Sequence, residues 1–278
     1  MGESKRRKTE IEKLKALSPE SQVLLHQLNQ DQNIILQGID PEISGSAQVS
    51  AMARLLVAKF QIAKEQKTIT PVIEYFYSKI EATVSRLNKI SDIVDCQKGR
   101  SHCCNIWVSI SAPEVLFIAK IVREKGQSLI DKVIAANEYT KNYDFDSRYE
   151  HPYPCPLLEN NICSIYNSRP KACRLAVSVD SKICERSYLN STEEGIPTPM
   201  LYLYARNAYD ISFAVSLKKV ALPYAMYEFN AALVRAIETD DAELKWLSGE
   251  DIFADVVCDP TDIFSTQEAQ FIYEKSFE

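Results

Sequence analysis

Glycine is scarce in this sequence, and its spacing excludes the common phosphate-binding loops. There are seven glycines among 278 residues, and the two nearest in sequence are Gly38 and Gly45. A loop that cradles phosphate needs glycines a few residues apart, because its backbone N–H groups approach the anion closely. Neither the dinucleotide-binding pattern nor the Walker pattern can be written anywhere in the chain.

Long apolar runs and an excess of basic residues are also missing. No run approaches the roughly eighteen apolar residues of a membrane span, and the chain opens without the charged-then-apolar pattern of a secretory leader. The net charge is −6, whereas a general nucleic-acid binder needs a concentrated positive surface. The basic run at 5–8 is expected to be a solvated start. We therefore expect a cytoplasmic protein with no membrane and no nucleic-acid partner.

Cysteine, in contrast, is concentrated in the middle of the chain. Seven of the eight cysteines fall between residues 96 and 184, and the eighth, Cys258, is expected to be a lone thiol. The cytosol keeps thiols reduced, so clustered cysteines there indicate metal binding or redox chemistry more often than structural disulfides. The predicted metal ligands are Cys96, Cys103, Cys104, Cys155, Cys163, Cys173 and Cys184.

Apolar residues recur at helical spacing on both sides of the cysteines. The predicted helices cover about residues 1–40, 52–63, 70–87, 114–139 with an interruption at Gly126, 199–215 and 226–237. The helices over 52–63 and 70–87 are expected to pack as an antiparallel pair. Ser111 and Glu114 form a capping-box pattern, in which the Ser oxygen accepts a free backbone N–H and the Glu side chain reaches back.

The segment from Lys141 to Arg186 has little periodicity of either kind and contains four prolines and four cysteines. Prolines and the Asn160-Asn161 pair break it too often for a regular helix or strand. Such a long irregular stretch inside a compact chain needs something other than a core to hold it, and a metal would do so. The predicted fold is therefore mainly α, a bundle-like helical body around an irregular, metal-stabilised cysteine-rich segment.

Three regions follow from this organisation, and they can pack as one domain. They are an N-terminal helical region (1–92), a cysteine-cluster metal-binding domain (93–187) and a C-terminal helical region (188–278).

Seven thiols exceed one four-ligand site and fall one short of two. Adjacent residues such as Cys103 and Cys104 have diverging side chains, so they suit neighbouring metals better than one zinc. His102 or His151 could supply a missing ligand. Nearby cations would offset the negative charge of a thiolate centre. These cations are Lys98, Arg100, Arg169, Lys171, Arg174 and Lys182.

The block CPLLENNICSIYNSRPKACR, residues 155–174, with the later Cys184, resembles the YkgJ-type cysteine-cluster family of zinc- or iron-chelating domains with a CxxCxxCC signature. In that family a first group ending in paired cysteines precedes a helix and a block of the form CP-L-…-C-IY-RP-CR. Here Cys103 and Cys104 match the pair, and Cys155, Cys163 and Cys173 match the later thiols. The resemblance covers roughly residues 93–187 and implies a bound metal.

One position departs from the family's pattern. In the form Cys-x-x-Gly-Cys-x-x-Cys-Cys the second cysteine falls at residue 100, where this chain has Arg100. A histidine, water or backbone group could substitute, one metal could keep an open position, or the metal could bind less tightly. The missing thiol also argues against the Cys-x-x-x-Cys-x-x-Cys spacing of radical S-adenosylmethionine enzymes.

The sequence thus favours a protein with a cysteine-ligated zinc or iron centre, with a 4Fe–4S cluster among the options. A closed zinc site would be structural, and an iron–sulfur centre would allow redox or Lewis-acid chemistry. The alternative is a metal-cluster-dependent protein-modifying enzyme, because the family resemblance extends to flagellin lysine N-methylases. No residue outside the cluster supports carrying that activity over.

Overall fold

The computed structural model describes residues 19–43, 45–90, 93–189 and 195–277, and most of these residues are helical. The basic run at 5–8 and the start of the first predicted helix lie outside the described residues. None of the helices in the described ranges is both long and apolar enough to cross a lipid bilayer.

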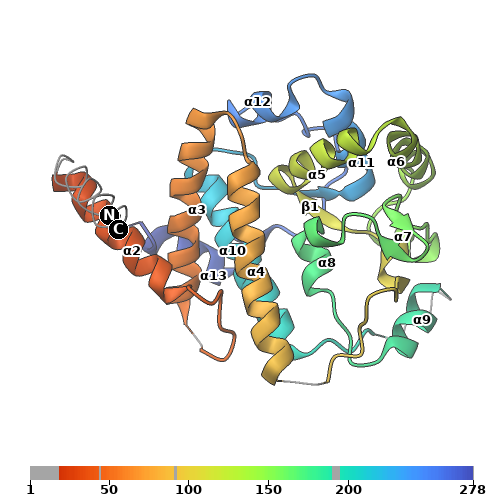
Figure 1. Ribbon diagram of the computed structural model, residues 1–278, viewed down its shortest axis with the longest axis horizontal. Helices are drawn as coiled ribbons and strands as arrows, with labels where there is room; N and C mark the ends of the chain where they lie inside the picture. The colour runs from red at the N-terminus through yellow and green to blue at the C-terminus, as the bar shows by residue number, and fades with distance from the viewer. Residues whose placement is uncertain (1–18, 44, 91–92, 190–194, 278) are drawn as a thin grey trace, which may run out of the picture.

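Five helices form the larger layer of the molecule (Figure 1). They are α2 (Pro19–Ile34), α3 (Ser46–Gln66), α4 (Thr70–Ile90), α10 (Met200–Lys219) and α13 (Gln267–Lys275). The predicted pairing of α3 and α4 is confirmed, because the two helices are in contact across a three-residue connection in which Lys67 adopts a left-handed conformation. α10 packs against both of them, and α2 lies along α3.

A second group of helices packs beside a short two-stranded sheet. The group comprises α5 (Ala112–Lys125), α6 (Gln127–Thr140), α11 (Phe229–Glu238) and α12 (Ala242–Leu247). β1 (Ser109–Ser111) pairs antiparallel with β4 (Met226–Glu228), with Ser109 opposite Glu228. The predicted interruption at Gly126 is confirmed, since α5 ends at Lys125 and α6 begins at Gln127. The predicted helix from residue 226 is wrong at its start, because Met226–Glu228 pair with β1 before the helix begins.

The cysteine-rich segment, which was expected to lack regular secondary structure, contains several short helices and strands. Between Lys141 and Arg186 the structure has α7 (Ser147–Glu150), β2 (Leu158–Glu159), β3 (Ile162–Cys163), the 3₁₀ turn η2 (Tyr166–Ser168), α8 (Lys171–Leu175) and α9 (Ser181–Leu189). The 3₁₀ turn η1 (His102–Asn105) carries the first thiol pair, and η3 (Ile263–Ser265) precedes α13. Elements of two to nine residues are too short for the hydrophobic periodicity by which sequence patterns are recognised.

One continuous core joins the molecule. Its buried apolar side chains include Met52 in the N-terminal region, Leu157 in the cysteine-rich segment and Trp246 in the C-terminal region. Phe60 stands edge-on to the rings of Phe213 and Trp246, with centroids 5.6 and 6.3 Å apart. Such pairs add about 0.5–1.5 kcal/mol beyond the area that they bury.

A buried tyrosine of α10, Tyr209, ties the loop between α2 and α3 to α4. The Tyr209 hydroxyl donates to the Lys79 carbonyl at 2.7 Å, lies 2.8 Å from the Thr83 hydroxyl, and accepts from the Ile39 N–H. Gly38 passes so close to α4 that a Cβ there would overlap the Lys79 carbonyl and the Thr83 hydroxyl, and its φ is +78°. Only glycine suits this crossing, because an L side chain is strained at that φ even without the overlap.

Candidate metal centre

Backbone hydrogen bonds hold the two halves of the cysteine sequence side by side. The Cys155 N–H donates to the Cys104 carbonyl at 2.7 Å, and the Tyr153 N–H donates to the Asn105 carbonyl at 2.8 Å. These bonds bring the first thiol pair against the start of the second block, about fifty residues later in sequence. The Cys104 N–H in turn closes a tight turn onto the Ser101 carbonyl at 2.9 Å.

Cys155 and Cys163 are placed by the hairpin of β2 and β3. Leu158 pairs with Cys163, and the turn is made by Asn160 and Asn161 with φ of +51° and +62°. Asparagine tolerates the left-handed conformation that a two-residue hairpin turn requires at both positions. The pair that sequence analysis counted as a breaker is therefore the turn that sets the spacing of two thiols.

Each of these two cysteines receives a backbone N–H from the residue two positions later. Burial raises the pKa of both thiols, and a backbone N–H opposes part of that rise, from Leu157 at Cys155 and from Ile165 at Cys163. A hydrogen bond to the charged form of a group favours that form. Both turns therefore offer preformed support for a thiolate.

Cys173 is positioned from a distance by Glu114. The carboxylate of Glu114 is buried and accepts from the Lys171 N–H at 2.7 Å, which fixes the first residue of α8. It also accepts from the Ser111 hydroxyl at 2.7 Å and the Tyr77 hydroxyl at 3.2 Å. The predicted capping box at Ser111 is thus wrong, because Glu114 turns into the protein and Ser111 donates to its carboxylate.

Cys96 and Cys184 share one residue as a partner. The Ser178 N–H donates to Cys96 Sγ at 3.1 Å. Burial raises the pKa of the Cys184 thiol, and a hydrogen bond with the Ser178 hydroxyl opposes part of that rise. The Asp95 N–H donates to the Ser178 carbonyl at 2.9 Å, so the loop that carries Cys96 runs beside the turn that precedes α9. Cys184 lies in the first turns of α9 and is buried.

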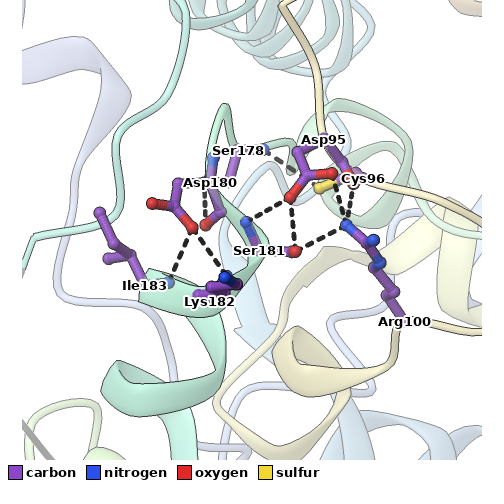
Figure 2. A network of polar contacts seen from close by, with 8 residues as sticks. All are labelled: Asp95, Cys96, Arg100, Ser178, Asp180, Ser181, Lys182 and Ile183. Atoms are coloured by element: carbon purple, nitrogen blue, oxygen red, sulfur yellow. Dashed lines mark hydrogen bonds and ion pairs between the residues drawn. The ribbon is translucent and has the colours of Figure 1, made fainter.

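Arg100, at the position where the sequence pattern predicts a missing cysteine, closes this junction (Figure 2). Its Nη1 donates to the Asp95 carbonyl, to Asp95 Oδ1 and to the Ser181 hydroxyl, each at 2.6 Å. Asp95 Oδ2 accepts from the Ser181 N–H at 2.9 Å. The Ser181 hydroxyl and N–H, together with Arg100, lower the pKa of Asp95 to about 2. Arg100 therefore joins the first cysteine loop to the start of α9.

Cys103 and Cys104 interact as a pair that shares one proton. A hydrogen bond with Cys104 lowers the pKa of the Cys103 thiol to about 7, and the positive charge of Arg169 acts in the same direction. The pKa of Cys104 is raised by its bond to Cys103, by burial and by the charges of Cys103, Cys173 and Cys155. The two thiols therefore titrate as a pair, and a single negative charge is shared between them.

The remaining cysteines lie near enough to Cys103 for its charge to affect the pKa of most of them. Burial is the largest influence on the pKa of the other five and raises it in each, to about 12 for Cys155. Negative charge on Cys103 raises the pKa of four of them further. These are Cys96, Cys155, Cys173 and Cys184. Cys163 is linked to the same group through Cys155 and Cys173. The seven thiols predicted as ligands thus lie in one electrostatic neighbourhood around Cys103.

Three further observations bear on the predicted ligands. In the described ranges, no three His, Cys, Asp or Glu side chains converge closely enough to hold a metal ion. Cys258 lies elsewhere, opposite Tyr227 and with Asp251 and Asp259 as its charged neighbours. His102 is part of η1 beside Cys103, whereas the ring of His151 stacks on Tyr143 with centroids 4.1 Å apart.

The six predicted cations have different surroundings. Arg169 lowers the pKa of Cys103, Cys163 and Cys173. Its guanidinium lies over the Tyr166 ring at 3.9 Å, and its buried Nε has no hydrogen-bond partner. Lys171 instead forms an ion pair with Asp210, and Arg174 pairs with Glu81 and lies 4.2 Å over the Tyr77 ring.

Sequence reasoning missed Glu114, Asp95 and Ser178 as positioning residues. Glu114 was assigned to its own helix because the local pattern resembles a cap, and its true partner, Lys171, lies 57 residues away. Asp95 precedes Cys96 in sequence, but the pairing of these two residues with Ser178 across more than eighty residues has no local signal.

The comparisons with known proteins agree with the motifs. Residues 95–194 match the family described as "CxxCxxCC: Putative zinc- or iron-chelating domain". The predicted resemblance to this zinc- or iron-chelating family is confirmed over that range, about a third of the chain. No curated protein and no solved structure matches the chain.

Proposed function

We propose that the cysteine segment chelates zinc or iron through thiolates, and that this is the function of the region matched to the chelating family. The observation that carries the proposal is the set of backbone N–H groups directed at thiols. The Ser178 N–H donates to Cys96 Sγ at 3.1 Å, and the N–H groups of Leu157 and Ile165 oppose the rise in pKa that burial causes at Cys155 and Cys163. These bonds favour the thiolate, which is the form that binds metal.

The donor set fits a thiophilic metal. Cys103 and six other thiols form the set, and the positive charge of Arg169, whose buried Nε has no hydrogen-bond partner, acts on Cys103, Cys163 and Cys173. The burial that raises the pKa of each isolated thiol is offset when a metal cation neutralises several thiolates at once. Metal binding would draw the thiols together by side-chain rotation from the arrangement described above.

The proposed ligands are Cys96, Cys103, Cys104, Cys155, Cys163, Cys173 and Cys184. His102, next to Cys103, is better placed than His151 to complete the set, because the ring of His151 is stacked on Tyr143. Arg100 takes no part as a ligand, since its guanidinium is engaged by Asp95 and Ser181. Closed zinc coordination would make the centre structural, and a 4Fe–4S cluster would add redox or Lewis-acid chemistry.

The test is substitution of single cysteines in the full chain purified without oxygen. Cys163→Ala and Cys173→Ala are expected to lower the bound metal and to make residues from about 144 to 186 sensitive to limited proteolysis, while the flanking helices survive. Cys258→Ala is the matched control, since Cys258 lies away from the other thiols. Equal metal content and equal resistance to cleavage in all three variants would contradict the proposal.

A cytoplasmic location belongs to the same proposal, because reduced thiols persist there. No observation on the described residues favours the alternative of a protein-modifying lysine N-methylase, so metal binding is the function proposed.

A further inference from the structure

A cavity of about 800 Å³ opens beside the cysteine cluster. It lies between α8, α10, β1 and the loop that follows α12, and Cys103 and Cys173 form part of its wall. Small-molecule sites are commonly concave pockets of about 300–1,000 Å³ with mostly apolar walls and a few polar groups. The size of this cavity fits a small organic ligand and exceeds what a bare metal ion needs.

Aromatic rings line one side of the cavity. The Trp107 ring meets Phe145 with centroids 5.7 Å apart, and Phe145 meets Tyr149 at 6.0 Å. All three line the cavity, and Phe76 and Phe213 line it from α4 and α10. The faces of aromatic rings carry negative charge density and attract cations. We call Trp107, Phe145 and Tyr149 the aromatic wall.

A carboxylate lies beside the aromatic wall. Asp259 accepts from the Ser109 hydroxyl, which also accepts from the indole N–H of Trp107 at 3.0 Å. Burial raises the pKa of the Tyr149 hydroxyl, and negative charge on Asp259 adds to that rise. The Asp259 carboxylate is half-buried and is further held by the Thr261 N–H at 2.8 Å. An acidic group is thus linked to Trp107 of the aromatic wall through the Ser109 hydroxyl.

Taken together, the charged side chains that line the cavity favour a positively charged ligand. Its lining contains five carboxylates, from Glu114, Asp210, Asp251, Asp259 and Asp262, and two cations, Lys171 and Arg206. Asp210 forms an ion pair with Lys171 and lies 3.9 Å from Arg206, and the charge of Asp259 also acts on Lys171, so five carboxylates face two cations in this lining. An anionic ligand would meet excess negative charge, and a cationic one would be attracted.

We propose that this cavity binds a small organic cation, an amine or quaternary ammonium with an apolar or aromatic body. The charged nitrogen lies at Asp259 against the aromatic wall, and the body extends toward Phe76 and Phe213. The cation site does not rest on the proposed metal ligation, because neither Asp259 nor the aromatic wall belongs to the thiol group, although Cys103 and Cys173 also border the cavity.

The experiment measures binding of three probes of equal size to the full chain by calorimetry. Phenethylamine carries a positive charge, 2-phenylethanol is neutral, and phenylacetate is negative. Phenethylamine is expected to bind at least about tenfold more tightly than 2-phenylethanol, since a cation over an aromatic face and beside a carboxylate gains on both counts. Phenylacetate is expected to bind more weakly than either.

Two variants locate the site. Asp259→Asn removes the carboxylate charge with little change of shape and is expected to weaken phenethylamine binding about tenfold, with 2-phenylethanol unaffected. Asp251→Asn, on the exposed part of the lining, is expected to weaken it less and keeps the test available if Asp259→Asn does not fold. Asp131→Asn is the matched control, because Asp131 is exposed on α6 away from the lining residues.

No preference for phenethylamine over the other two probes would overturn the proposal, as would equal affinity in Asp259→Asn and Asp131→Asn. Metal content is measured on the same samples. Protein without metal that still binds phenethylamine would contradict the metal proposal alone, and metal-loaded protein without cation preference would contradict the cavity proposal alone.

Discussion

Replacing Glu114 with alanine is expected to destabilise the protein and to release α8, which carries Cys173. The Glu114 carboxylate is 1 % exposed and accepts from the Tyr77 hydroxyl, the Ser111 hydroxyl and the Lys171 N–H at 2.7–3.2 Å. Hydrogen bonds to charged groups contribute about 1.5–3 kcal/mol each, and their contributions overlap when one acceptor is shared.

The Glu114→Ala change leaves a buried hydroxyl at Tyr77 and a buried N–H at Lys171 without their acceptor. We expect a loss of about 3–5 kcal/mol of unfolding free energy, because an unsatisfied buried donor costs about 1–3 kcal/mol. A protein of this size loses about 2–4 °C in Tm per kcal/mol, so the transition should fall by roughly 10 °C. The loss of the Lys171 contact should also speed hydrogen exchange at the backbone N–H groups of α8.

Thermal unfolding by circular dichroism and hydrogen exchange by mass spectrometry measure the two effects. Glu124→Ala is the matched control, since Glu124 is exposed on the same helix and its change is expected to stay within about 0.5 kcal/mol. Glu114→Gln keeps an acceptor for the Lys171 N–H, so its Tm should lie between those of Glu114→Ala and Glu124→Ala. The reasoning is refuted if Glu114→Ala has the same Tm as Glu124→Ala. It is also refuted if the Tm of Glu114→Ala falls while hydrogen exchange in α8 is unchanged.

Three further changes test other parts of the structure. Arg100→Ala should speed hydrogen exchange at the backbone N–H groups of residues 178–184, and Tm should change little because the contacts of Arg100 are exposed. Unchanged hydrogen exchange at these residues would argue against the junction with α9. Burial raises the pKa of Glu228 to about 7, so its contribution to stability is full below pH about 4.5 and is lost as the pH rises to about 7. Glu228→Gln should make the denaturant midpoint less dependent on pH in this window, whereas Glu238→Gln, at the exposed end of α11, should leave that dependence unchanged. The same pH dependence in both variants would refute the raised pKa of Glu228. Gly38→Ala should lower the free energy of unfolding in urea by at least about 2 kcal/mol, because the alanine is strained at positive φ and its Cβ overlaps α4. A urea midpoint equal to that of the unmodified protein would contradict the close approach of Gly38 to α4.

The helical body could be predicted because its helices are long enough to show their periodicity. α3, α4 and α10 each span five or more turns, and the break between α5 and α6 falls at a glycine with φ of +99°. The start of α11 could not be predicted, because β4 is three residues long and its pairing with β1 joins residues far apart in sequence. Apolar spacing over so few residues fits a strand and a helix turn equally well.

The thiols of the candidate site could be found from sequence, and the groups that position them could not. Cysteine spacing is a local pattern, whereas the contact of Glu114 with Lys171 and that of Cys96 with Ser178 depend on the tertiary fold. Arg100 illustrates the difference. Its sequence position marks a missing thiol, and only the structure shows that its guanidinium joins Asp95 to Ser181.

Elemental analysis of the unmodified chain, purified without oxygen, tests the central proposal most directly. We expect zinc or iron in stoichiometric amount, and iron with acid-labile sulfide and a brown colour if the centre is a cluster. Folded protein with neither metal and with all its thiols free would contradict a cysteine-ligated metal centre.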